Sequence, residues 1–146
     1  LLGDVAIEVD GKRRNPADCL IYRGMMLSDV PNLSFSFGYT NASWTLKADL
    51  TSGYLCRMLN HMKKKGVAVA LPRRNPEVEE LPFMDFSSGY VQRALALLPK
   101  QGSQKPWKLY QNYALDRASL KYGAVDDGTI IFASREAVIA KETVPA

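Results

Sequence analysis

The sequence has few of the residues from which proteins build metal and redox sites. It contains one histidine and two cysteines among 146 residues. A structural zinc site takes about four histidine or cysteine ligands, and a disulfide framework takes several spaced cysteines. We therefore expect no metal site, and we expect Cys19 and Cys56 to be reduced, buried, small apolar side chains.

Sequence motifs for catalysis are also missing. There is no Gly-x-Gly-x-x-Gly fingerprint, no P-loop and no nucleophile elbow. His61 lies among lysines, where a surface role is the expected one. Glu77, Glu79 and Glu80 lie in a proline-bearing stretch with no apolar frame that would separate their pKa values, so they indicate solvated charge. We assign no catalytic residue from the sequence.

The charge pattern argues against a nucleic-acid partner. The formal net charge of +4 comes largely from three short clusters at residues 12–14, 63–65 and 73–74. Such clusters are typical of nucleic-acid binding or of solvated surface. No aromatic residues are interleaved with them, which favours solvated surface. No apolar run is long enough to cross a bilayer and no signal-peptide pattern is present, so we expect a cytoplasmic protein.

The first half of the chain predicts strands and one long helix. Asp10-Gly11 predicts a hairpin turn between short strands. Further strands are expected at residues 18–22, 33–37 and 67–71, and Met25 and Met26 are expected in the core. A helix is predicted over residues 43–65, ending at Gly66. Its expected apolar stripe is Leu46, Leu50, Tyr54, Met58 and Met62.

The second half predicts a loop, two helices and a strand. Residues 73–82 are charged and contain proline, which indicates a loop or linker. Helices are expected at residues 88–98 and 109–122, separated by an irregular stretch over 99–107. Asp127-Gly128 predicts a turn into a last strand at 129–132.

The start of the long helix is the strongest candidate for a site. A strand, a glycine and a short polar segment lead into it, an arrangement that directs free backbone N–H groups at an anion or an electron-rich cofactor edge. The alternative is a well-capped helix with two core aromatics. The candidate cofactor-binding residues are Gly38, Tyr39, Thr40, Asn41, Ser43, Trp44 and Thr45.

Several longer segments resemble one enzyme family. They are residues 22–28, 38–49, 83–94, 98–102 and 106–113, which include Gly-Tyr-Thr-Asn-Ala-Ser-Trp and Pro-Trp-Lys-Leu-Tyr-Gln-Asn-Tyr. These segments resemble the C-terminal portion of flavin-containing monooxygenases, most closely the Baeyer–Villiger-type group that includes ethionamide-activating monooxygenases. The chain also begins Leu1-Leu2-Gly3 without an initiator Met, so we expect an upstream portion to be missing.

The resemblance implies an enzyme that uses FAD and NADPH to insert one oxygen atom from O2 into ketones, sulfides or amines. Its fold would be α/β. Residues 1–72 would hold the closing strands and long helix of the FAD-binding domain, and residues 73–146 a mostly helical C-terminal extension. The helix start from Gly38 to Thr45 would abut the flavin.

The partners would be a small-molecule substrate and the missing N-terminal FAD and NADPH domains, with homo-oligomers an open question. The chain alone would be inactive. The alternative is a stand-alone binding or self-association module without catalytic activity.

Overall fold

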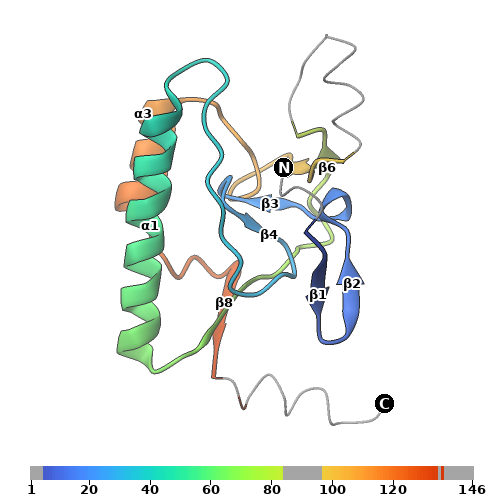
Figure 1. Cartoon of the computed structure of the whole chain (residues 1–146). Coiled ribbons are helices and arrows are strands. Elements are labelled where there is room, and N and C mark those ends of the chain that lie inside the picture. Colours follow the sequence, from blue (N-terminus) through green and yellow to red (C-terminus); the bar gives the residue numbers. More distant parts are fainter. Residues whose placement is uncertain (1–4, 84–96, 135, 137–146) are drawn as a thin grey trace.

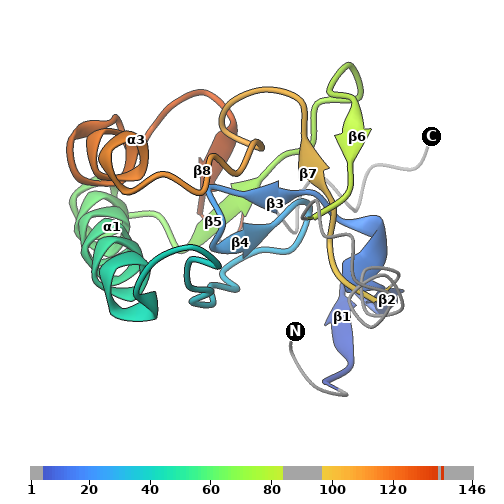
Figure 2. The same cartoon turned by 90° about the horizontal axis from the view of Figure 1, so that it is seen from above.

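The computed structural model describes residues 5–83, 97–134 and 136. In this part of the chain, two α-helices lie side by side along one flank of a group of small antiparallel sheets (Figure 1). Viewed from above, the helices form one layer and the sheets lie beside it (Figure 2). The fold is therefore of mixed α/β character, as expected.

The N-terminal hairpin confirms the turn prediction. Strand β1 (Ile7–Val9) pairs antiparallel with β2 (Lys12–Arg14). Asp10 and Gly11 have φ of 53° and 72°, the left-handed backbone that a tight hairpin turn requires. Ile7 is buried in a small cluster with Cys19, Leu27 and Val30.

A second, fully buried hairpin follows. A 3-10 turn, η1 (Pro16–Asp18), precedes β3 (Ile21–Tyr22), which pairs antiparallel with β4 (Met26–Leu27). The strand expected at residues 18–22 is therefore shorter, because η1 holds its first residue. Met25 and Met26 are wholly buried, which confirms the prediction that they belong to the core.

The strand predicted at residues 33–37 is wrong. The segment makes only a single bridge, between Ser34 and Met26, and Phe35 donates its backbone N–H to the Met25 carbonyl at 2.9 Å. β4 offers only two residues as a partner. The alternating aromatics therefore pack as an extended segment without a regular ladder.

Helix α1 (Trp44–Lys65) confirms the main prediction. Gly66 closes it in the left-handed conformation, with its N–H bonded to the carbonyl of Lys63. Leu50, Tyr54, Met58 and Met62 are buried as expected, but Leu46 is 39% exposed and Lys47 only 6% exposed. Within the described residues, no helix is long and apolar enough to cross a membrane.

Two small sheets join distant parts of the chain. β5 (Val69–Pro72) pairs antiparallel with β8 (Ile130–Ala133), and β6 (Glu80–Leu81) pairs antiparallel with β7 (Gln101–Gly102). The first pair confirms two predicted strands with ends shifted by one or two residues. The second lies in stretches that were expected to be irregular.

The last helix begins later than expected. Asn112 accepts the Leu115 N–H and caps α3 (Tyr113–Arg117), which runs into a π-helical turn, η2 (Ala118–Tyr122). Residues 109–112 are not helical, but the predicted end at Gly123 is confirmed. The helix expected at 88–98 lies outside the described residues except for Leu97 and Leu98, which are not helical.

Candidate functional site

The segment from Gly38 to Thr45 leads directly into α1. Gly38 is buried beneath the Trp44 ring: a Cβ at this glycine would lie 2.2 Å from Trp44 Cγ. Real Cβ atoms are not found so close to another heavy atom, so the approach of this ring requires glycine. The indole packs on Phe37 with ring centroids 5.3 Å apart and is 58% exposed. A partly exposed aromatic ring, that of Trp44, therefore lies at the N-terminal end of α1.

Gln111 holds the polar part of this segment in place. Its side-chain oxygen accepts from the Thr40 N–H at 3.2 Å and from the Thr40 hydroxyl at 3.4 Å. Its backbone carbonyl accepts from the Asn41 side-chain amide at 3.1 Å. Ser43 and Thr45 share a hydroxyl–hydroxyl bond at 2.8 Å. Thr40 and Asn41 thus fasten the segment to the residues before α3, seventy positions away.

A buried charge cluster lies directly behind the segment. Asp116 Oδ2 accepts from Lys47 Nζ at 2.8 Å and from the Tyr39 hydroxyl at 2.7 Å. The Lys47 and Asp116 side chains are 8% and 14% exposed, and Tyr39 is 2% exposed. Burial, followed by the bond to Asp116, raises the pKa of Tyr39. A neutral phenol and an ion pair therefore join α1, α3 and the segment at one point.

Among the described residues, the backbone N–H groups of Trp44 and Thr45 at the start of α1 have no acceptor, whereas Leu46 N–H donates to the Ser43 carbonyl at 3.3 Å. Ser43 is the N-cap residue but makes no side-chain capping bond, and the first turn of α1 contains no acidic residue. Free N–H groups and the helix dipole together favour a negative or electron-rich group. The donor set fits the edge of a flavin ring, with Trp44 as an apolar neighbour. Tyr39, by contrast, is already committed to Asp116.

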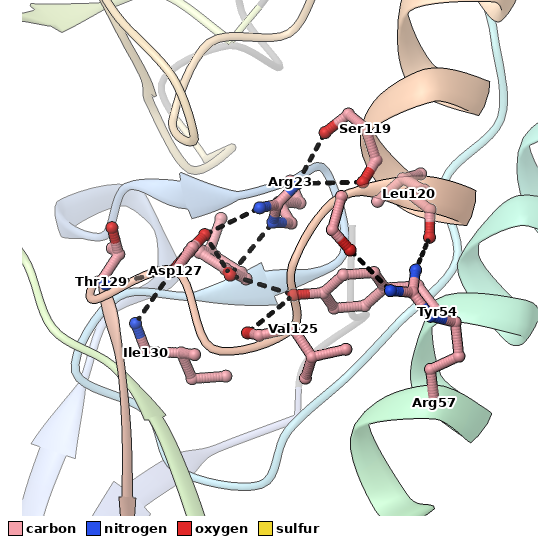
Figure 3. Close-up of polar contacts among 11 residues, drawn as sticks. Arg23, Tyr54, Arg57, Ser119, Leu120, Val125, Asp127, Thr129 and Ile130 are labelled. Atoms are coloured by element: carbon pink, nitrogen blue, oxygen red, sulfur yellow. Dashed lines mark hydrogen bonds and ion pairs between the residues drawn. The ribbon is translucent and has the colours of Figure 1, made fainter. Parts of the chain in front are cut away.

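A second polar network lies at the turn between β3 and β4. Arg23, at φ 51°, forms an ion pair with Asp127 at 2.8 Å and donates to the Ser119 hydroxyl at 2.6 Å (Figure 3). Tyr22 accepts from Arg23 Nε at 3.0 Å and donates to Asp127 at 2.9 Å. Its hydroxyl also lies 3.1 Å from that of Tyr54. Burial raises the pKa of both tyrosines.

This network borders a cavity of about 520 Å³. The cavity lies between the Arg23 turn, residues 105–110 and the α3–η2 helix. A much smaller hollow, about 10 Å³, adjoins it through Leu109, Tyr110 and Asp116 and reaches Gly38 and Tyr39. The predicted segment and the large cavity are therefore neighbours.

The sequence did not reveal Arg23, Lys47, Asp116 or Asp127 as members of these networks. The Lys47–Asp116 and Arg23–Asp127 pairs join residues that are 69 and 104 positions apart along the chain, so no local spacing could connect them. The lysine within the apolar stripe of α1 was the one available signal, because a lysine on a buried helix face needs a partner.

Other expectations have mixed outcomes. Both cysteines are free, and Cys19 is buried, but Cys56 is exposed because it lies on the solvent side of α1. Glu80 is not simply solvated: it binds Arg74 and Lys100, and these bonds lower its pKa. His61 is partly buried against Phe132, with ring centroids 4.8 Å apart. Among the described residues, no group of three or more potential ligands could hold a metal ion.

Comparison with known proteins gives a consistent result. The chain is 47% identical over 140 residues to the FAD-containing monooxygenase EthA of Mycobacterium tuberculosis, a match that covers 95% of this chain and 29% of the relative. It is 43% identical over 137 residues to the probable FAD-binding monooxygenase AlmA of an Acinetobacter species, covering 92% and 28%. The putative FAD-containing monooxygenase MymA of M. tuberculosis is 40% identical over 136 residues, covering 92% and 28%.

The chain thus spans less than a third of the length of these curated relatives. No protein-family profile matches it, and no solved structure gives a significant match.

Proposed function

Because this chain is homologous to the FAD-containing monooxygenases, we propose that it is the C-terminal portion of an FAD- and NADPH-dependent monooxygenase. The parent enzyme would be cytoplasmic and of the Baeyer–Villiger type, inserting one oxygen atom from O2 into a ketone, sulfide or amine. The observation that carries the proposal is the identity of 47% over 95% of the chain. In this division, residues 1–72 complete the FAD-binding domain and residues 73–146 form its C-terminal extension.

Within that enzyme, residues 38–45 form one wall of the flavin site. Bound FAD supplies the reduction of dioxygen. The chain contributes the backbone N–H groups at the start of α1, which stabilise negative charge at the edge of the ring system. Trp44 contributes an apolar face, and Gly38 allows the indole to lie close to the backbone. Gln111 and the Lys47–Asp116 pair hold this wall at a fixed position relative to α3.

A glycine pair tests the placement of the wall in the full-length parent protein. Gly38→Ala would displace the Trp44 ring, whereas Gly53→Ala is a control on an exposed part of α1, with no atom within 4 Å of the new Cβ. We expect the parent and G53A to be purified yellow and to add one oxygen atom to thioanisole with NADPH, as measured by mass spectrometry. G38A should lose bound FAD, product formation or both.

Three outcomes would contradict the proposal at different levels. A full-length protein without bound flavin would overturn the enzyme assignment. Equal flavin content and activity in G38A and G53A would overturn only the wall. The isolated chain is expected neither to retain FAD nor to oxidise NADPH, so stoichiometric yellow colour in residues 1–146 alone would refute the fragment interpretation.

The second candidate is a stand-alone self-association module. Trp44 and Leu59 are 58% and 54% exposed on α1, and a second copy of the chain could cover these apolar side chains. The remainder of a monooxygenase could cover the same residues. The intact mass of the expressed gene product separates the two candidates, since several hundred residues support the enzyme and about this length supports the module.

A further inference from the structure

The 520 Å³ cavity between the Arg23 turn and the α3–η2 helix is lined by both apolar and charged residues. Its apolar lining consists of Pro106, Leu109, Leu115, Ala118 and Leu120. Its volume lies within the range of about 300–1,000 Å³ that is usual for small-molecule sites. An apolar body of moderate size could therefore be accommodated.

The acidic groups at the cavity are already neutralised. Asp127 is bound by Arg23 and by the Tyr22 hydroxyl. Asp116 is bound by Lys47 and by Tyr39. A cationic ligand would have to compete with these short, partly buried contacts, so the lining carboxylates offer little to attract one.

The two lysines that line the cavity differ from these carboxylates. Lys105 and Lys108 both line the cavity and both are exposed. Their ammonium groups lie 5.4 Å and 5.6 Å from the centroid of the Tyr110 ring. Among the described residues, neither lysine makes an ion pair. Each ammonium group is therefore free to pair with an anion at the cavity.

We propose that this cavity binds an organic anion with an apolar body, whose carboxylate or phosphate is held by Lys105 and Lys108. The apolar body lies against Leu109, Leu115 and Ala118, and the Arg23–Asp127 pair closes the polar side. The site needs no flavin, so it stands or falls independently of the proposed enzyme activity.

Calorimetric titration of this chain with three probes tests both halves of the site. The probes are 4-phenylbutanoate, its uncharged counterpart 4-phenylbutan-1-ol, and inorganic phosphate. We expect saturable 1:1 binding of 4-phenylbutanoate, at least tenfold weaker binding of the other two, and weaker binding of the acid at high salt because exposed charges are screened. Equal affinity for acid and alcohol, or no saturable binding of the acid, would overturn the proposal.

Two double variants with the same change of net charge locate the anion. K105A/K108A should weaken 4-phenylbutanoate binding at least tenfold and remove its salt dependence. K12A/K64A removes two exposed lysines that do not line the cavity and should leave binding unchanged. A118F should weaken binding of the acid by reducing the space for the phenyl group.

Circular dichroism checks that each variant is folded, and the probe and salt comparisons on the unmodified chain require no variant. Equal losses in both double variants would show general charge attraction and would overturn the site.

Discussion

Replacement of Lys47 by Met would test whether the buried charge cluster stabilises the fold. The change keeps most of the apolar stem and removes the ammonium group, leaving the Asp116 carboxylate with only the Tyr39 hydroxyl as a side-chain partner. Removing one member of a buried ion pair costs about 3–5 kcal/mol. Because Tyr39 still donates to Asp116, we expect a loss near the low end, about 3 kcal/mol.

The ion pair between Arg73 and Asp29 provides a matched control. Its N···O distance is 3.1 Å, close to that of Lys47–Asp116, but the Arg73 side chain is 58% exposed. Exposed pairs contribute about 0–1 kcal/mol, and salt screens them. R73M should therefore lower the free energy of unfolding only slightly, and 1 M NaCl should remove the difference between R73M and the unmodified chain.

Urea unfolding measures these differences, followed by circular dichroism and by the change in tryptophan fluorescence as the buried Trp107 becomes exposed. D116L and the double variant K47M/D116L complete a cycle. We expect the double variant to lose less stability than the two single variants together, since it leaves no unpaired charge behind. The reasoning is refuted if K47M and R73M unfold within about 0.5 kcal/mol of each other.

Two further predictions concern pH and thiol reactivity. Burial raises the pKa of Tyr22, Tyr39 and Tyr54, so above about pH 10 the unfolded chain loses phenolic protons that the folded chain keeps. The stabilising effect of these tyrosines should be complete below that pH and fall above it, and the fall should be shallower in Y39F. Urea midpoints at pH 8 and pH 11 measure the difference. A Y39F profile that matches the unmodified chain would exclude Tyr39 from the effect. Cys56 is exposed, whereas Cys19 is buried and its pKa is raised by burial. Ellman's reagent should therefore titrate one thiol in the native chain and both thiols in urea. Two rapidly reacting thiols without urea would contradict the burial of Cys19.

Features whose causes are local could be predicted from the sequence. The Asp10-Gly11 turn needs only its own backbone angles, and the end of α1 needs only Gly66 in the left-handed conformation. Both were predicted correctly. The family resemblance likewise rested on short segments of sequence, and the comparisons support it.

Features that depend on a distant partner were predicted poorly. The alternating residues 33–37 are typical of a strand, but β4 is too short to pair with them. The short pairing of β6 with β7 depends on segments twenty residues apart. In each case the missing information is the position of another part of the chain.

The start of α1 depends on both local sequence and contacts with distant residues. Steps of four residues advance about 40° beyond a full helical turn, so a stripe through Leu50, Tyr54 and Met62 cannot also keep Leu46 on the buried face. Lys47 lies on the buried face instead of Leu46, and its ammonium group can be buried there because it pairs with Asp116 of α3. The sequence alone predicted that a long helix begins shortly after Gly38, and it left open whether the first turn of that helix is capped. The tertiary structure decided which side chains there are committed, because burial of a charge depends on a counter-charge that the fold brings from far along the chain.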